Sequence, residues 1–326
     1  MKHLLLSFLL LTSLVADQDD WRFERINIYL ENDAEFDTDI GYTDGSKFSA
    51  LLYRPNVEGH WLRIPFTENL TRSHFISFSA ARQMFTPDDL KEPELIEEDQ
   101  PYAGCFYYEM GLHQSSQRHL DSLVIQVGVV GPASLGEAYQ KYVHDLLDVA
   151  YPAGWEHQLS NEIGLQLNYQ HKWRFVPDEI WGVESSIIPY AGGEFGNIAM
   201  KANSGASVRI GWNIPEDFDT SFIDDVGESG VPVHPNSVLD GSKTWSLTFN
   251  LAAGGSFVAR DIFLDGNTFK ESHSVEKNLL RAYGRYGFTA RYKSFIVDYH
   301  KVYNTEHYKT QGYGHKYGAI CISYLY

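Results

Sequence analysis

Apolar and polar residues alternate with a period of two along most of this chain. In the segment 121–131, for example, Leu123, Ile125 and Val127 share one face while Gln126 lies on the other. Alternate residues of a β-strand point to opposite faces, so each such segment predicts a strand with one apolar face and one polar or small face. The predicted strands, about twelve in all, are 22–32, 43–54, 73–84, 103–115, 121–131, 161–175, 183–199, 203–214, 243–258, 279–291, 293–304 and 314–326, and the turn-like stretches between them include 215–235 and 265–274.

An even number of antiparallel strands with one polar face fits a membrane β-barrel. A soluble β-sandwich has the same alternation, so periodicity alone does not separate the two folds. The end of the chain favours the barrel, because Ile320, Ile322 and Tyr324 share a face with the terminal Tyr326. Bacterial outer-membrane barrels often end this way, and we expect the barrel-assembly machinery to recognise this strand. We therefore predict an all-β fold, a single transmembrane antiparallel β-barrel.

One segment follows a helical pattern instead. Residues 133–147 contain no proline and no glycine after Gly136, and Pro132 and Ser134 suit a helix start. The segment predicts a short helix between the fifth and sixth strands. A helix inserted in a run of strands needs a reason, and an active-site element would be one. The apolar positions with helical spacing are Leu135, Tyr139, Tyr142, Val143, Leu146 and Leu147.

The first residues indicate export. A basic start at Lys2 precedes an apolar run that ends near the small residue Ala16, which is the layout of a secretory signal peptide over 1–16. We expect the barrel domain to occupy 17–326 and to lie in the bacterial outer membrane. The best later apolar run, 123–130, contains Gln126 and is too short to span a bilayer as a helix, so strands must cross the membrane.

Composition narrows the choice of partners and of redox chemistry. The net charge of −17 argues against a nucleic-acid partner and hints at a divalent cation near anionic lipid. The aromatic content of 14% suits the aromatic belts of a membrane barrel, although many soluble β-proteins share it. Two cysteines, Cys105 and Cys321, exclude a disulfide-dense scaffold. They could pair, but each lies in strand-like alternation, which favours packing as a small residue.

A polar loop joins the first two predicted strands and is the first candidate for chemistry. It begins with Glu31, Asn32 and Asp33 and continues to Thr43 and Asp44, with Asp37 and Asp39 between. Carboxylate, amide and carbonyl oxygens are hard ligands that suit Ca²⁺, although the spacing is not that of an EF-hand. The alternative is a polar hairpin loop with no ligand, in which Gly41 and Gly45 serve the turn.

His144, on the predicted helix, is the second candidate. A lone histidine is more often structural or exposed, but Gln140 and Asp148 lie four residues to either side, where each could fix its tautomer. Two further segments, Pro101–Gly104 and Gly154–Leu159, combine turn residues with aromatics and by themselves read as structural. The sequence has no Gly-x-Ser-x-Gly elbow, no His-Glu-x-x-His and no P-loop, so the usual signatures of soluble hydrolases are missing.

Taken together, four ordered segments resemble the outer-membrane lipid A 3'-O-deacylase family. The resemblance implies a twelve-stranded barrel with a calcium-dependent site near its outer mouth, and hydrolysis of the ester that holds the 3'-linked acyloxyacyl group of lipid A in lipopolysaccharide. The segments are ENDAEFDTDIGYTDG (31–45), PYAG (101–104), VGVVGPASLGEAYQKYVHDLL (127–147) and GWEHQL (154–159).

Residue roles follow from the same resemblance. The active-site Asn-Asp pair corresponds to Asn32 and Asp33, the hydroxyl residue to Thr43, and the helix histidine to His144. His144 would act as general base on a water, and Ca²⁺ held near Asp33 and Thr43 would polarise the ester carbonyl. Asn32 could donate a further hydrogen bond to the oxyanion.

Two positions depart from the family pattern. The acidic residue expected six positions after the histidine is Ala150 here, and Asp148 is the candidate to replace it. The family lysine after the third strand has only an approximate counterpart in Lys91, which we take as the candidate substrate-binding residue. The alternatives to a deacylase are a non-catalytic outer-membrane barrel, such as a pore or adhesin, and an outer-membrane phospholipase.

Overall fold

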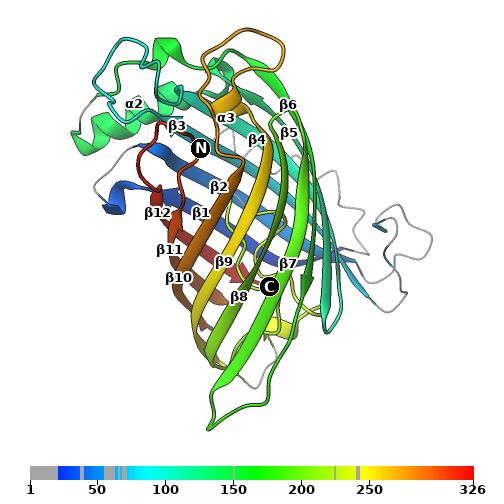
Figure 1. The fold of residues 1–326 in the computed structure, drawn as a ribbon. Helices are drawn as coiled ribbons and strands as arrows, with labels where there is room; N and C mark the ends of the chain where they lie inside the picture. Colours follow the sequence, from blue (N-terminus) through cyan, green and yellow to red (C-terminus); the bar gives the residue numbers. More distant parts are fainter. Residues whose placement is uncertain are drawn as a thin grey trace.

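The computed structural model describes residues 21–36, 40–54, 63, 64, 67, 72–149, 151–223, 225–239 and 243–326. Twelve antiparallel strands form one closed barrel, in which β1 pairs with β12 and every other strand pairs with its neighbours in sequence (Figure 1). This confirms the predicted barrel. The strands are β1 (Arg22–Asn32), β2 (Gly41–Arg54), β3 (Ser73–Thr86), β4 (Ala103–Ser115), β5 (His119–Val130), β6 (Glu162–Trp173), β7 (Glu184–Gly196), β8 (Ala199–Trp212), β9 (Trp245–Asp261), β10 (Leu280–Tyr292), β11 (Phe295–Asn304) and β12 (Lys316–Leu325).

The strand bounds agree with the sequence pattern to within a few residues, and the largest difference is at β8. This strand begins at Ala199 rather than at 203, because only Asn197 and Ile198 separate it from β7. The Asn197 side chain stabilises this tight turn by donating to the Glu162 carboxylate (2.8 Å) and accepting from Leu165 N–H (2.8 Å). Small and polar residues at the start of β8 hide its alternation in the sequence.

The two faces of the wall differ in polarity. In β6 the outward residues Ile163, Leu165 and Leu167 are exposed, whereas the inward residues Gln166 and Asn168 are buried. A soluble sandwich buries its apolar face, but this barrel exposes it, which is the arrangement of a membrane barrel. No helix in the described ranges is long and apolar enough to cross a membrane.

The outward face of the last strand fits the same arrangement. Ile320, Ile322, Tyr324 and Tyr326 are all exposed, as their shared face in the sequence predicts. Recognition of this strand by the barrel-assembly machinery stays a prediction. The predicted signal peptide, 1–16, lies outside the described residues.

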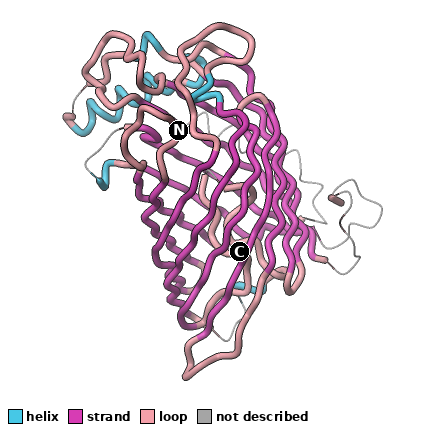
Figure 2. The backbone as a smooth tube through the Cα atoms, in the orientation of Figure 1, coloured by secondary structure: helices cyan, strands magenta, loops and turns pink. Residues whose placement is uncertain are grey.

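The connection from β8 to β9 fills the lower lumen instead of forming a simple turn. We call its described residues, 214–223 and 225–239, the plug; they include a short 3₁₀ turn, η4 (Ser237–Leu239). Phe218 and Val231 are fully buried there. Figure 2 draws the loops of the chain in pink and the strands of the wall in magenta. The plug is also bonded to the wall, since Arg209 on β8 donates to Asp217 (2.5 Å). The sequence predicts a turn-like stretch over 215–235, and its described residues form no named strand or helix. Several of its polar residues, such as Asp217 and Glu228, are nevertheless buried and bond to residues of the wall.

The helical elements other than η4 gather at one end of the barrel, drawn uppermost in Figure 1. There the loops that follow β3, β9 and β11 pack together: the His273 ring donates to the carbonyl of Asp99 (2.7 Å), and the Tyr308 hydroxyl donates to the Asp99 carboxylate. These interlocked loops cover this end of the lumen. The helical elements are η1 (Ala34–Phe36), η2 (Pro132–Ser134), α2 (Gly136–Leu147), η3 (Trp155–His157) and α3 (Ile262–Asp265).

The predicted helix between the fifth and sixth strands is present, but it starts later than expected. Residues 132–134 form the 3₁₀ turn η2, and Leu135 has a left-handed backbone (φ 61°) that separates this turn from α2. The α-helix then runs from Gly136 to Leu147. Pro132 and Ser134 therefore belong to the 3₁₀ turn and do not start the α-helix.

Candidate active site on the outer wall

Asn32, Asp33 and Thr43 come together where β1 ends and β2 begins. Asn32 Nδ2 donates to the carbonyl of Thr43 (3.0 Å). The Asp33 carboxylate is buried and accepts a hydrogen bond from Ile40 N–H (2.7 Å). The Thr43 hydroxyl lies 2.6 Å from that of Thr86 on β3. The three predicted residues thus form one group at the end of the barrel that carries the helices.

The local fold explains this grouping. Alternation along β1 turns Glu31 toward the lumen and leaves Asn32 exposed on the outer face. The pairing of β2 with β3 shifts register between Tyr42 and Asp44, so a bulge lies at Thr43. A bulge re-aims the side chain at which it occurs, and bulges are common beside functional sites.

Helix α2 has a polar face buried and an apolar face exposed. Gln140 and His144 are buried, whereas Leu135, Tyr142 and Leu146 are about two-thirds exposed (67%, 65% and 71%). In a soluble protein the apolar stripe of such a helix faces the core. Here α2 packs its polar face against β3 and β4, on the outside of the wall, and turns its apolar face away from the protein.

Two glycines bring α2 close to the wall. A Cβ at Gly136 would lie only 3.0 Å from the Cα of Gly104 on β4 and 3.1 Å from the Trp155 ring. Trp155, which is fully buried, donates its indole N–H to Gln140 Oε1 (2.7 Å) and packs on Tyr102 (ring centroids 5.0 Å apart). The segments Pro101–Gly104 and Gly154–Leu159 therefore fix the helix on the barrel, in agreement with their structural interpretation.

Arg82 links the helix to the hairpin, and the sequence reasoning missed it. Its guanidinium lies over the Tyr139 ring of α2 (3.1 Å to the centroid) and within 3.3 Å of the Asp44 carboxylate and of the Ser46 hydroxyl. A signal was present, because the alternation of β3 places Arg82 on the outward face that α2 covers.

Lys91 lies elsewhere. It is exposed in the loop after β3, its N–H donates to Asp89 (2.9 Å), and the neighbouring Leu90 carbonyl accepts from Ala153 N–H (2.8 Å). Among the described residues, the structure gives Lys91 no contact with the hairpin or with α2. The cation that does contact both is Arg82.

Asp148 does not share the buried face of Gln140 and His144. It is the C-cap of α2 with a left-handed backbone (φ 54°), its side chain is exposed, and its N–H donates to the carbonyl of His144. The sequence-based expectation of a shared face is wrong here, because a residue in this conformation leaves the helical path. Ala150 lies outside the described residues.

The hairpin offers oxygen donors for a cation. The Asp33 carboxylate, the Thr43 hydroxyl and the Asn32 amide are hard ligands of the class that Ca²⁺ takes, usually about six to eight at once. Within the described ranges, no group of three or more His, Cys, Asp or Glu side chains could hold a metal ion. Asp37 and Asp39 lie outside those ranges. The oxygen donors of Asn32, Asp33 and Thr43 fit calcium, and water or substrate would supply the remaining ligands.

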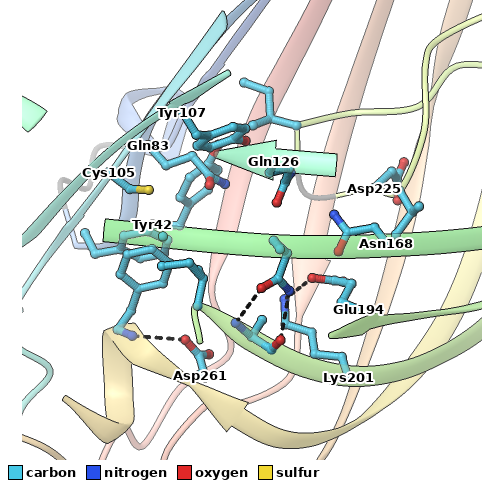
Figure 3. A pocket seen from close by; sticks show the side chains of 18 of the residues that line it. Tyr42, Gln83, Cys105, Tyr107, Gln126, Asn168, Glu194, Lys201, Asp225 and Asp261 are labelled. Atoms are coloured by element: carbon cyan, nitrogen blue, oxygen red, sulfur yellow. Dashed lines mark hydrogen bonds and ion pairs between the residues drawn. The ribbon is translucent and has the colours of Figure 1, made fainter. Parts of the chain in front are cut away.

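Apart from the hairpin and α2, the barrel encloses a cavity (Figure 3). It is lined by Tyr42, Gln83 and Asn168 among others, and crossed by the ion pairs Arg281–Asp261 (2.7 Å) and Lys201–Glu194 (3.8 Å). Buried amide oxygens such as that of Asn168 have no protein partner there, as expected of a water-filled chamber. None of the predicted catalytic residues lines it, so the candidate site is on the outer face of the wall.

The two cysteines are buried and unpaired, on β4 and β12. This confirms the interpretation of Cys105 and Cys321 as packed small residues.

Comparison with known proteins identifies the family and the fold of this chain. The family described as outer membrane protein LpxR matches residues 4–326. LpxR from Salmonella typhimurium has the same fold, with a TM-score of 0.73 and 18% identity over 93% of this chain and 100% of that chain. The β domain of the Bordetella autotransporter BrkA matches less well, with a TM-score of 0.45 and 7% identity over 94% of this chain and 98% of that one. No curated protein sequence matches. With its family match over nearly the whole length, this chain belongs to the LpxR family of outer membrane proteins.

Proposed function

We propose that the protein is a lipid A deacylase that removes the 3'-linked acyloxyacyl group of lipopolysaccharide in a calcium-dependent hydrolysis. The observation that carries the proposal is the reversed helix α2. It buries His144 against the wall and exposes its apolar face. Arg82 links this helix to the β2 side of the hairpin, because it lies over Tyr139 and pairs with Asp44. Membership of the LpxR family supports the same substrate class.

The exposed face of α2 indicates how the substrate reaches the site. Leu135, Tyr142 and Leu146 are exposed, as are Ile125 and Val127 on the outer face of β5. In an outer-membrane barrel this surface contacts acyl chains. A lipid can therefore approach the helix sideways from the leaflet without passing through the lumen.

Each site residue has a part in ester hydrolysis. As general base, one ring nitrogen of His144 would accept the proton of the attacking water. Asn32 and Thr43 orient the polar head of the substrate at the bulge, and Arg82 offers a cation to its phosphate groups. Asp33 and Thr43 would hold calcium, which when bound stabilises negative charge on the ester oxygen. No covalent serine intermediate is needed.

Two features of the structure argue against the alternative of a pore. The plug fills the lower lumen, and the loops after β3, β9 and β11 interlock across the other end. A conducting barrel needs a continuous water path, and we infer that these segments interrupt it. A phospholipase remains chemically close, since it would use the same base and cation on another lipid ester.

The decisive experiment is mass spectrometry of lipids incubated with the purified, folded protein. We expect loss of the 3'-acyloxyacyl group from lipid A, no release of fatty acid from phospholipid vesicles, loss of activity in excess chelator and recovery with added Ca²⁺. Fatty acid released only from phospholipid would identify a phospholipase. Full activity in excess chelator would remove calcium from the mechanism.

A further inference from the structure

Glu31 immediately precedes Asn32, but its side chain lies on the opposite face of the wall. Its side chain points into the lumen and is fully buried. The proposed chemistry takes place outside and does not use it. A buried carboxylate is costly unless hydrogen bonds compensate for its lost hydration, so its partners indicate its role.

Two donors from different segments bond to the Glu31 carboxylate. The Tyr42 hydroxyl on β2 donates to Oε2 (2.7 Å), and the backbone N–H of Ile223 in the plug donates to Oε1 (2.8 Å). The carboxylate therefore joins β1, β2 and the plug at one point.

This junction lies directly behind the candidate site. On the lumen face, Glu31 bonds to Tyr42; on the outer face, the next residue, Asn32, bonds to the carbonyl of the next residue, Thr43 (3.0 Å). The two bonds close the same end of the β1–β2 pair from both sides. A displacement of Tyr42 or Glu31 must therefore move Asn32 and Thr43.

Tyr42 has little room to move. A Cβ on Gly45 would lie 1.9 Å from the Tyr42 hydroxyl and 3.0 Å from the Ile223 side chain, so only glycine fits between the strand and this junction. The Tyr42 ring packs edge-on against Tyr317 (5.1 Å between centroids), and the buried His315 ring donates to the Tyr42 carbonyl (2.9 Å).

The plug is bonded to the same two strands a second time, lower in the lumen. The buried Glu228 carboxylate accepts from the Asn27 amide of β1 (2.9 Å) and from the Ser49 hydroxyl of β2 (2.9 Å). The plug thus runs along the inside of the strand pair that carries Asn32 and Thr43, and braces it at two levels.

We propose that Glu31 is a positioning residue, and that the plug acts through it and Tyr42 to hold the Asn32, Asp33 and Thr43 group in its working geometry from inside the barrel. This inference deepens the proposed function and rests on it for its catalytic readout. The segment between β8 and β9 then has a task beyond filling space, since it supports an active site on the opposite face of the wall.

The test compares two variants that each lose one lumen hydroxyl. Tyr42→Phe removes the donor to Glu31, whereas Tyr283→Phe removes a hydroxyl that bonds to Tyr190 (2.7 Å) on another part of the wall. We expect Tyr42→Phe to lower kcat about tenfold with little change in KM, because misplaced catalytic groups slow chemistry more than binding. Tyr283→Phe should keep the parental kcat, and the heat-dependent gel shift confirms that both barrels fold.

A second readout does not depend on activity. Hydrogen exchange of the peptide spanning 31–45 should become about tenfold faster in Tyr42→Phe and stay unchanged in Tyr283→Phe. Parental kcat and parental exchange in Tyr42→Phe would overturn the inference. If the parental protein cleaves no lipid, the proposed function fails on its own, and the exchange experiment still decides whether the plug and Glu31 hold the hairpin.

Discussion

At the scale of single residues, His144 is distinguished from its neighbours on α2 by burial. Tyr142, Asp145 and Leu146 are exposed, whereas His144 faces the wall on the same side as Gln140. A buried polar side chain needs hydrogen-bond partners to offset its lost hydration. Under the proposed function, this position against the wall is where His144 would act as general base.

The first prediction concerns this base. His144→Ala should lower the rate of lipid A deacylation about 10²–10⁴-fold, because no other group accepts the proton of the water. His144→Asn should lower it as much, since asparagine is polar but not basic. Deacylation is measured by mass spectrometry, and folding by the heat-dependent shift of the barrel on a gel. Parental rates in both folded variants would show that His144 is structural.

Asp148 supplies a matched control and the second prediction. Its side chain is exposed and its backbone is left-handed (φ 54°), a conformation that asparagine tolerates well. Asp148→Asn should therefore keep the helix end intact and change the rate less than about twofold. A loss comparable to that of His144→Asn would show that the carboxylate does support the histidine, as the sequence alone suggested.

At the scale of elements, the site depends on how closely α2 approaches β4. Gly136 and Gly104 face each other with no space for a side chain, and Trp155 closes the contact. The segments around 101–104, 136–147 and 154–159 therefore form one structural unit, in which small residues set the distance between the helix and the wall.

The third prediction tests this contact. Gly136→Ala should push α2 away from the wall and lower activity about tenfold or more, while barrel stability changes little because α2 lies outside the sheet. Gly284→Ala on β10 is the control, since a Cβ there meets nothing within 4 Å. Activity and heat resistance are measured for both. Equal activity in the two variants would mean that the close approach is not required.

At the scale of the whole molecule, the barrel is closed laterally and blocked along its axis. Asp217 in the plug pairs with Arg209 (2.5 Å) and lies near Arg25 (3.7 Å), while Glu228 bonds to β1 and β2. Breaking these buried contacts lowers the stability of the fold more than breaking surface ion pairs, because it leaves charges unpaired in the lumen. The plug is therefore a fixed part of the fold.

The fourth prediction follows from this blocked lumen. In planar bilayers the parental protein should show no conductance steps. Asp217→Ala combined with Glu228→Ala should release the plug and produce steps, whereas Asp89→Ala with Glu94→Ala, two exposed acids, should stay silent. Steady conductance of the parental protein would restore the pore as a function.

The sequence by itself determined the strands, their number, the helix between the fifth and sixth strands and the grouping of Asn32, Asp33 and Thr43. Period-two alternation and short-range turns encode these features locally, and the hairpin brings its own residues together. The tertiary structure alone decided whether the polar face lines a closed lumen or a solvated sheet, because both have the same period. It also decided where the plug lies, because the plug sequence has no periodicity. The contact of Arg82 with α2 depends on a helix some sixty residues away. The exposure of Asp148, away from the buried face of α2, follows from its left-handed cap conformation. Such features arise from contacts between distant segments, and no local pattern records them.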